Sequence, residues 1–259
     1  MKLATWNVNS LAVRLPQLLD WLSTNPVDAL VLQETKLTDD KFPQAEIEAA
    51  GYSVAFHGQK TYNGVALLSR GAAATDVVKN IPGFDDDMAR VITGTVAGAR
   101  GGVRVIGGYF PNGQAPDSDK FVYKMRWLDA LRGFVADELQ RHPQLVLMGD
   151  FNIAPEDRDV YDPVAWAGQI HCTPEERGHF QQLCGLGLHD AFRLFDQPPR
   201  LWSWWDYRNL AFRKNQGLRI DIILVSDALR GQVQGCVIDK LPRKSERPSD
   251  HAPVVVDLA

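Results

Sequence analysis

Short apolar segments typical of β-strands alternate with amphipathic helical segments along the whole of this 259-residue chain. We expect strands at residues 2–8, 29–32, 52–56, 64–69, 91–96, 103–109, 145–148, 219–225, 232–238 and 254–258. Helices between strands, together with hairpins in the middle of the chain, predict mixed β-sheets that pack face to face with the helices outside. The fold class is therefore expected to be α/β.

Two shorter helices are expected from their spacing and their end signals. Residues 15–22 place leucines at helical intervals, and Pro16 would be tolerated in the first turn of that helix. Residues 175–186 follow Thr173 and Pro174, which is the preferred order of an N-cap followed by a first-turn proline.

The longest helix is expected at residues 117–141, where apolar side chains recur at steps of three and four. This spacing leaves Lys124, Arg132 and Asp137 for the opposite, solvent-facing side. No Gly/Ser/Pro linker and no repeat of 20 to 50 residues interrupts the chain, so we expect residues 1–259 to form one domain.

Composition limits the environment in which the chain can work. The longest apolar runs have four residues, whereas a membrane span needs about 18 to 20. The N-terminus, MKLATWNVNS, lacks the apolar stretch and cleavage site of a secretory signal. The cysteines at 172, 184 and 236 fit neither a disulfide framework nor a zinc site. We expect a cytoplasmic protein without a membrane partner.

Charge is unevenly distributed along the chain. The net charge of −4 by itself argues mildly against a polyanionic partner. Residues 1–199 hold 18 basic and 25 acidic residues, while residues 200–259 hold 10 and 7. Two basic runs, at 206–219 and 240–247, favour contact with phosphates, so the overall value says little about the partner.

Polar residues of unusual kinds stand at the ends of the expected strands. They are Asn7, Glu34, Tyr109, Asp150, Asn152, Asp221, Asp250 and His251. Each one alone has an ordinary explanation as a helix cap or a solvated turn. Loops at one edge of a sheet converge, however, so these residues can gather in one cleft.

A helix cap or a solvated turn is least able to explain Asp221, for which His251 is a possible partner. Asp221 lies within the apolar segment IDIILV, so its carboxylate is expected to be partly buried and to need a partner. His251 is a natural partner, because an Asp that accepts from one imidazole nitrogen fixes the tautomer and leaves the other nitrogen for a substrate.

Glu34, Asp150 and Asp250 have no basic neighbours in sequence to neutralise them. Carboxylates in one cleft repel each other unless a cation lies between them, and oxygen ligands suit Mg²⁺ or Mn²⁺ better than zinc. A hard divalent cation with Asn, His and Tyr groups suits hydrolysis of a phosphodiester. Walker, GxSxG and GxGxxG motifs are absent, which disfavours nucleoside triphosphate, acyl and dinucleotide chemistry.

Seven ordered motifs between residues 5 and 254 extend this interpretation. They are TWNVNSL, ALVLQETK, GYFPNG, LMGDFNIAP, WSWWDYR, GLRIDIILVS and SDHAPV. In this order and spacing they closely resemble the exonuclease III and apurinic/apyrimidinic (AP) endonuclease family. The resemblance implies a four-layer α/β sandwich of two packed mixed β-sheets, with the site at one end of the sheets.

The resemblance also implies roles for individual residues. Glu34 would be the principal metal ligand, with Asn7 and Asp250 nearby, and the metal would be Mg²⁺, or Mn²⁺ in its place. The implied catalytic residues are Asp150, Asn152, Tyr109, Asp221 and His251. Asp150 would orient or deprotonate the attacking water, Asn152 would hold the water or the phosphate, and Tyr109 would stand near the leaving oxygen. Sequence leaves open whether Asp150 or His251 is the base.

DNA contacts are implied at further positions. Arg90 and Asn112 would contact backbone phosphates, and Trp204, Leu218 and Ile220 would form a wall against the target sugar. Arg208 and Lys214 belong to the basic run beside this aromatic segment. The implied partner is duplex DNA with 3′ ends, nicks or abasic sites, bound by a monomer with modest, salt-sensitive affinity.

Two positions depart from the family pattern. Asn9 stands where some members have Asp, which puts any second metal site in doubt. His171 and Cys172 stand where members that cleave internal abasic sites usually have a small residue and Phe. One explanation is that the exchange is a neutral substitution in a loop. The other is that the His171 imidazole contacts the DNA and fills the space that a flipped abasic sugar would need.

The expected function is a Mg²⁺-dependent DNA repair nuclease that acts as a 3′-phosphodiesterase, 3′-to-5′ exonuclease or abasic endonuclease. We expect 3′-end processing to be favoured because of His171; the alternative is a full AP endonuclease. A lipid or inositol phosphodiesterase is disfavoured by the WDYR and RIDIILVS motifs. A catalytically silent DNA-binding protein is disfavoured because it would have no reason to keep mutually repelling acids.

Overall fold

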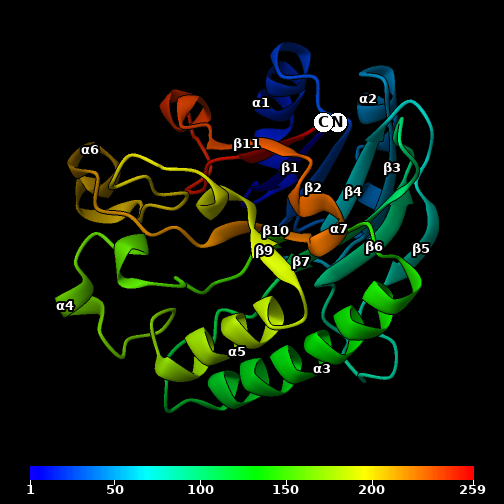
Figure 1. The fold of residues 1–259 in the computed structure, drawn as a ribbon. Coiled ribbons are helices and arrows are strands. Elements are labelled where there is room, and N and C mark those ends of the chain that lie inside the picture. The colour runs from blue at the N-terminus through cyan, green and yellow to red at the C-terminus, as the bar shows by residue number, and fades with distance from the viewer.

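The computed structural model describes residues 1–259 and contains two six-stranded β-sheets (Figure 1). The first sheet has the order β11 (Val233–Ile238), β12 (Val254–Leu258), β1 (Lys2–Asn7), β2 (Ala29–Gln33), β4 (Val65–Arg70), β3 (Tyr52–His57). The second has the order β5 (Thr75–Lys79), β6 (Val91–Val96), β7 (Val103–Tyr109), β8 (Leu145–Asp150), β10 (Asp221–Ser226), β9 (Leu188–Asp190). Each sheet has one parallel pair, β1 with β2 and β7 with β8, so both sheets are mixed as predicted.

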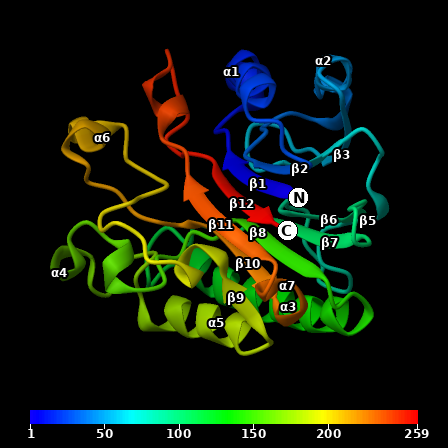
Figure 2. The same cartoon turned by 45° about the horizontal axis from the view of Figure 1, so that its top comes forward.

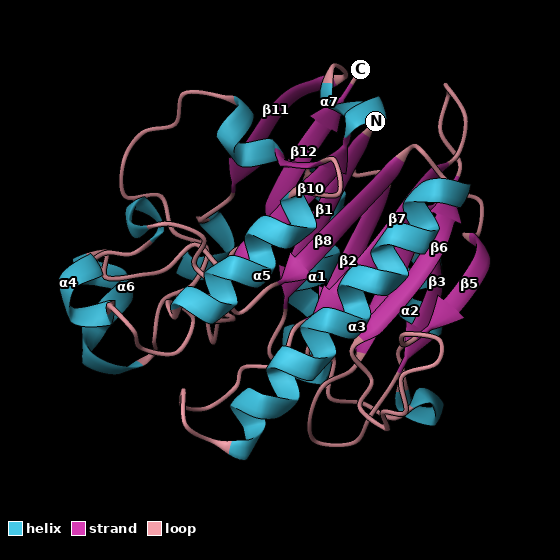
Figure 3. Cartoon of the chain, turned by 60° about the horizontal axis from the view of Figure 1, so that its bottom comes forward, coloured by secondary structure: helices cyan, strands magenta, loops and turns pink.

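Helices cover the outer faces of the two sheets and complete four layers. The helices are α1 (Leu11–Thr24), α2 (Gln44–Ala49), α3 (Asp119–Arg141), α4 (Pro163–Trp166), α5 (Pro174–Cys184), α6 (Ala211–Lys214) and α7 (Asp227–Arg230). In Figure 2, α1 and α2 lie above the strands and α3 and α5 below them, and Figure 3 shows α3 and α5 crossing the second sheet. The predicted four-layer α/β sandwich is therefore confirmed.

Three apolar clusters hold the layers together. The central cluster lies between the sheets and joins residues such as Leu3 and Val31 of the first sheet to Val105 and Met148 of the second. A second cluster packs α3 and α5 on the second sheet, and a third packs α1 and α2 on the first. None of the helices combines the length and the apolar character that a membrane span requires.

Each parallel strand pair is joined through a helix. The chain runs from β1 through α1 to β2 in the first sheet, and from β7 through α3 to β8 in the second. Since parallel strands end at the same edge, each crossover brings two strand ends together. Glu34 directly follows one crossover and Asp150 ends the other.

Two details of the expected helices are wrong. The helix expected at residues 15–22 begins at Leu11, so Pro16 lies inside it and not in its first turn. Backbone N–H groups of Ser10 and Leu11 donate to the carbonyl oxygens of Glu34 and Thr35, which anchors the earlier start. In α3, Lys124 does not face solvent: its side chain is fully buried in an ion pair with Glu176.

Six short elements were not expected from the sequence: α2, α4, α6, α7, β5 and β9. In α2 only Ile47 is buried, and β5 is an edge strand with an exposed surface, so neither has a strong periodic pattern.

The N-terminal signal of α5 is confirmed. Thr173 caps the helix, accepting from the N–H of Glu176, and the Glu176 side chain accepts from the N–H of Thr173.

Candidate active site

The predicted polar residues meet at one edge of the two sheets, where four strand ends converge. Asn7 ends β1, Tyr109 ends β7 and Asp150 ends β8. Strand register places Tyr109 opposite Asp150, and Asp150 opposite Asp221 at the start of β10. The site is therefore built by strand pairing and not by one flexible loop.

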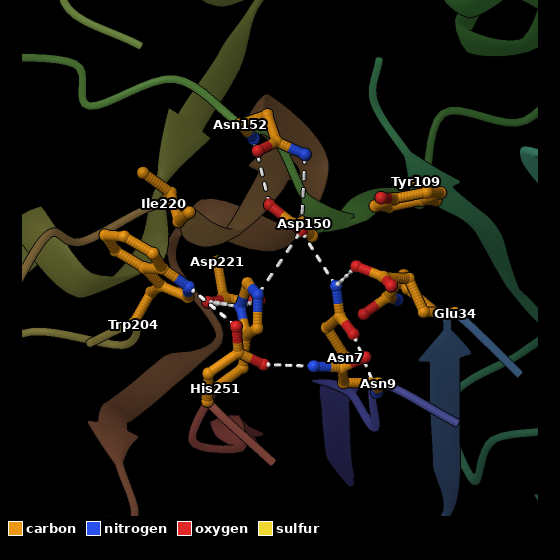
Figure 4. A network of polar contacts seen from close by, with 12 residues as sticks. Asn7, Asn9, Glu34, Tyr109, Asp150, Asn152, Trp204, Ile220, Asp221 and His251 are labelled. Atoms are coloured by element: carbon orange, nitrogen blue, oxygen red, sulfur yellow. Dashed lines mark hydrogen bonds and ion pairs between the residues drawn. The ribbon is translucent and has the colours of Figure 1, made fainter. Parts of the chain in front are cut away.

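Asn7 joins the two sheets across this edge. Its Nδ2 donates to Oε1 of Glu34 at 2.9 Å and to Oδ2 of Asp150 at 2.9 Å (Figure 4). Both N–H bonds of the amide are thereby used between two carboxylates. The amide reduces the repulsion that the two acids would otherwise suffer and sets their separation.

Asp150 and Asn152 form a tight turn after β8. The backbone N–H of Asn152 donates to Oδ1 of Asp150 at 2.9 Å, and its Nδ2 donates to the carbonyl oxygen of Phe110 at 3.0 Å. Asn152 has a φ of 49°, and Glu34 has a φ of 53°. Such left-handed backbone at non-glycine residues is costly and persists where surrounding contacts hold it.

Asp221 and His251 form the predicted hydrogen-bonded pair. Nδ1 of His251 lies 2.9 Å from Oδ2 and 3.1 Å from Oδ1 of Asp221, and both side chains are buried. Nε2 of His251 points toward Oδ2 of Asp150 at 3.7 Å (Figure 4). Asp221 thus orients the ring, and the other ring nitrogen faces the centre of the site.

Burial and charge move the pKa values of this group in a definite direction. Burial lowers the pKa of His251, but the neighbouring carboxylates, led by Asp221 and Asp150, raise it to about 10. Burial raises the pKa of the Asp150 carboxyl to about 7, and the charge on His251 limits that rise. These directions favour a cationic imidazole at neutral pH, beside an Asp150 carboxyl that titrates near neutrality.

Tyr109 and Arg90 lie on the far side of Asp150. Burial, followed by the charges of Glu34 and Asp150, raises the pKa of the Tyr109 hydroxyl well above its usual value. The Arg90 guanidinium lies over the Tyr109 ring at 5.1 Å, and its Nη1 donates to the Tyr109 carbonyl oxygen. Tyr109 therefore stays a neutral hydroxyl that can donate a hydrogen bond.

Glu34, Asp150 and His251 place ligand atoms within 4.8 Å of one another, the one such group near the site. Carboxylate oxygens such as those of Glu34 are the ligands that a hard divalent cation prefers, whereas the Asn7 amide turns its Nδ2 donor toward the two carboxylates. The other predicted ligand, Asp250, instead accepts from Nδ2 of Asn9 at 2.9 Å and from Nε1 of Trp204 at 3.0 Å. It lies beside this group without joining it.

Lys36 is a site residue to which the sequence analysis assigned no role. Its Nζ lies 2.8 Å from Oε2 of Glu34 and donates to Oδ1 of Asn9 at 2.5 Å. Lys36 stands two residues after Glu34 in the motif ALVLQETK, so the expectation that Glu34 has no basic neighbour in sequence was wrong, and this neighbour was the available signal. Its ammonium group occupies the side of Glu34 that faces Asn9.

The predicted DNA-contact residues fall into two sets. Asn112 and His171 adjoin Asn152: Nδ2 of Asn112 donates to Oδ1 of Asn152 at 3.3 Å and lies 3.5 Å from Nε2 of His171. Trp204 is half-buried over Leu218 and Ile220, which are 0% and 2% exposed and support the wall from below. Arg208 and Lys214 lie apart from both sets: Arg208 is exposed just before α6, and Lys214 is exposed at the C-terminal end of α6.

A groove of about 550 Å³ opens beside the site. Its lining includes Tyr109 and Asn112 from the site, the basic side chains Arg90 and Lys120, and the exposed Tyr62. Cationic and aromatic groups along one groove suit a nucleic acid strand, because they meet phosphates and bases respectively.

Comparison with known proteins agrees with the geometry. A model of the endonuclease/exonuclease/phosphatase family matches residues 4–251. Exodeoxyribonuclease III of Haemophilus influenzae is 35% identical over 263 residues, which cover 98% of this chain and 98% of the relative.

Two solved structures share the whole fold. The 3′ phosphatase NExo from Neisseria, bound to a product DNA hairpin, superposes with a TM-score of 0.96 at 50% identity, covering 100% of this chain and 99% of that one. An AP endonuclease from Archaeoglobus fulgidus gives a TM-score of 0.93 at 35% identity, with the same coverage. The chain therefore belongs to the endonuclease/exonuclease/phosphatase family and is a hydrolytic DNA repair nuclease of the exodeoxyribonuclease III and AP endonuclease type.

Proposed function

We propose that this protein hydrolyses phosphodiester bonds at 3′ ends of duplex DNA in a Mg²⁺-dependent reaction, and that it favours 3′-end processing over cleavage at internal abasic sites. The observation that carries the proposal is the network in which Asn7 links Glu34 to Asp150 while His251 faces the same carboxylate. All these groups come from one chain, which supports action as a monomer with one domain.

Asp150 is the group that we assign as general base. Its raised pKa, about 7, suits proton transfer at neutral pH, whereas His251 with a pKa of about 10 is already protonated. The Asp150 carboxylate would take the proton of the attacking water, and the His251 cation would stabilise negative charge on the phosphoryl oxygens.

The remaining groups position the phosphate and the leaving oxygen. The amides of Asn152 and Asn112 would donate to phosphate oxygens, and the neutral Tyr109 hydroxyl would donate to the leaving 3′ oxygen. Glu34 would hold the cation, with Asn7 and Asp250 nearby, which leaves Asp150 free to act as the base, and Mn²⁺ has the same ligand preference as Mg²⁺. When bound, the cation would polarise a phosphoryl oxygen and neutralise charge on the leaving group.

His171 is the residue that we assign to the 3′-end preference. Nδ1 of its buried ring donates to the carbonyl oxygen of Asn152 at 2.7 Å, and Nε2 lies 3.5 Å from the Asn112 amide. Burial and the nearby Lys124 charge lower the pKa of His171 to about 4, so the ring is neutral. The imidazole fills space next to the two phosphate-binding amides, where a smaller residue would leave room for an extruded sugar.

A related structure supports this preference: the Neisseria protein is described as a 3′ phosphatase and as a 3′–5′ exonuclease. The test offers equal amounts of protein three duplexes, carrying an internal abasic site, a nick with a blocked 3′ end, or a recessed plain 3′ end. With Mg²⁺, we expect the two duplexes with 3′ ends to be processed faster than the duplex with the internal abasic site. With EDTA, we expect none of the three duplexes to be cleaved.

The matched variants are His171→Gly, which should raise the rate at the abasic site relative to the blocked 3′ end, and Asp150→Asn, which should abolish all cleavage and spare DNA binding. An unchanged ratio in His171→Gly would remove the assignment of His171. Full activity in Asp150→Asn would show that the base is elsewhere, and absence of wild-type cleavage with Mg²⁺ would favour a silent DNA-binding protein.

A further inference from the structure

Lys124 is a fully buried lysine that the catalytic assignment leaves without a role. It lies on α3 next to Phe121 and Leu128 of the helix stripe that packs on the second sheet, and its side chain is 0% exposed. A charged ammonium group in such a place costs free energy unless every donor finds a partner.

All three donors of the Lys124 ammonium group have partners. Nζ donates to the carbonyl oxygen of Asn152 at 2.7 Å, to the carbonyl oxygen of Asn112 at 3.2 Å, and to Oε1 of Glu176 at 2.5 Å. Two of the three acceptors belong to the residues whose side-chain amides would bind the phosphate. The ammonium therefore fixes the backbone from which both amides project.

Glu176 extends these contacts to the neighbouring loop. It lies in the first turn of α5 and is fully buried. Its Oε1 also accepts from the backbone N–H of His171 at 3.1 Å, and its Oε2 accepts from the N–H and the hydroxyl of Thr173 at 3.0 and 2.8 Å. One carboxylate thus holds Lys124, the His171 backbone and the cap of α5 together.

The Asn152 carbonyl group is the point at which these contacts meet. It accepts from Nζ of Lys124 and from Nδ1 of His171, both at 2.7 Å. On the other side of the residue, the Asn152 N–H donates to the carboxylate of Asp150. Asn152 is held from both sides in a left-handed conformation that it would otherwise leave readily.

A second buried ion pair on the same helix provides a comparison. Arg104 of β7 pairs with Glu138 of α3 at 2.5 Å, with side chains 3% and 1% exposed. Its other contacts are the carbonyl oxygen of Asp76 and the hydroxyl of Thr95, at the opposite end of the sheet from the site. The Arg104 pair attaches α3 to the second sheet, whereas the Lys124 pair joins α3 to α5, and only the Lys124 pair touches residues of the site.

We propose that Lys124 and Glu176 are positioning residues, which hold the Asn152 and Asn112 amides and the His171 loop in the geometry required for phosphodiester hydrolysis. The inference rests on the proposed function and deepens it. Neither side chain reaches the substrate, because both are fully buried. They act by fixing the backbone that carries the phosphate-binding groups.

The experiment compares Lys124→Met with Arg104→Met on the preferred 3′-blocked duplex. We expect kcat of Lys124→Met to fall on the order of 10- to 100-fold, with KM and the Kd for DNA within about twofold of the wild type. Arg104→Met removes a matched buried charge and is expected to lose folding stability while retaining kcat within about twofold. Equal losses of kcat in the two variants, or a loss confined to KM, would overturn the proposal.

Glu176→Gln keeps the test falsifiable if Lys124→Met does not fold. It preserves the shape of the side chain and is expected to lower kcat while KM stays constant. A second readout, independent of cleavage, is the NMR spectrum of the free protein: Glu176→Gln should shift the Asn112 and Asn152 side-chain amide signals, and Arg104→Met should not. Unshifted signals would refute the positioning role, whereas shifted signals in a protein without cleavage activity would leave the positioning role intact and refute only the proposed function.

Discussion

The individual residues of the site are held in conformations that few other environments would support. Asn9, Glu34, Asn152 and His171 all have positive φ values. Each is held by contacts from another segment of the chain; the His171 ring, for example, donates from Nδ1 to the carbonyl oxygen of Asn152. The site is therefore organised before any ligand binds, which reduces the free energy needed to orient the reacting groups.

His251 depends on neighbouring carboxylates, above all Asp221, for its charged state. Its folded-state pKa, about 10, lies above the usual histidine value of 6.5, and Asp221 is the leading group that raises it. The raised pKa contributes stability that is fully present below pH 6.5 and is lost as the pH rises through about 10. Alkaline solution should therefore weaken both the folded state and the cationic form needed for catalysis.

Replacing Asp221 by Asn tests this dependence. We expect the pKa of His251 to fall in Asp221→Asn, because burial then acts on the imidazole without its main compensating charge. The measurement is an NMR titration of the ring signals in the free protein, with Asp227→Asn, an exposed acid that contacts His189, as control. A His251 pKa equal to that of the wild type would show that another group sustains the charge.

At the level of elements, two βαβ crossovers place the acids. The sequence pattern of a helix followed by a strand ending in an acid occurs twice, and the structure shows one such unit in each sheet. The second unit also requires glycine: a Cβ at Gly149 would lie 1.8 Å from the carbonyl oxygen of Gly108. Strands β7 and β8 can approach closely enough to bring Tyr109 beside Asp150 only because that atom is missing.

Helix α5 is a second element that matters for the site, because its N-terminal cap contacts Glu176. Thr173→Ala removes the hydroxyl that caps α5 and donates to Glu176, so we expect a loss of about 1 to 2 kcal/mol in the free energy of unfolding. Urea denaturation measures this loss. Thr173→Ser retains the hydroxyl and should recover most of the stability; if both variants lose the same amount, packing of the methyl group and not the cap explains the effect.

Across the whole molecule, the two sheets meet at the proposed metal site. Glu34 follows β2 of the first sheet, and Asp150 ends β8 of the second. A cation held by Glu34 beside Asp150 would relieve the repulsion between the two carboxylates and so link the sheets. Metal binding should therefore stabilise the complete fold and not only the local loop.

Thermal unfolding with and without Mg²⁺ measures this link. At about 100 times Kd, a ligand that binds only the folded state adds about 2.7 kcal/mol, which corresponds to a rise in Tm of roughly 5 to 10 °C. EDTA should reverse the rise. Glu34→Gln should abolish it, whereas Glu46→Gln on the exposed face of α2 should retain it. A full rise in Glu34→Gln would place the stabilising cation at another site.

Sequence patterns predicted the positions of the buried strands better than those of the short helices and strands at the surface. The strands at 91–96, 103–109 and 254–258 have the expected bounds, because Gly98, Gly102 and Pro253 lie at or close to their ends. Lys124 was misplaced although it stands three residues after Phe121 and four before Leu128, on the apolar stripe itself. Its charge predicted exposure to solvent, whereas the ion pair with Glu176 of α5 makes its burial possible.

The sequence by itself determined the strand and helix order, the family motifs and the chemical types of the site residues, because these depend on local spacing and residue identity. Tertiary structure decided which groups meet. The approach of His251 to Asp150, the contact of Lys36 with Asn9 and the burial of Lys124 against Glu176 depend on contacts between segments far apart in the chain. No local pattern encodes such distances, since they arise only when both sheets and their helices pack together.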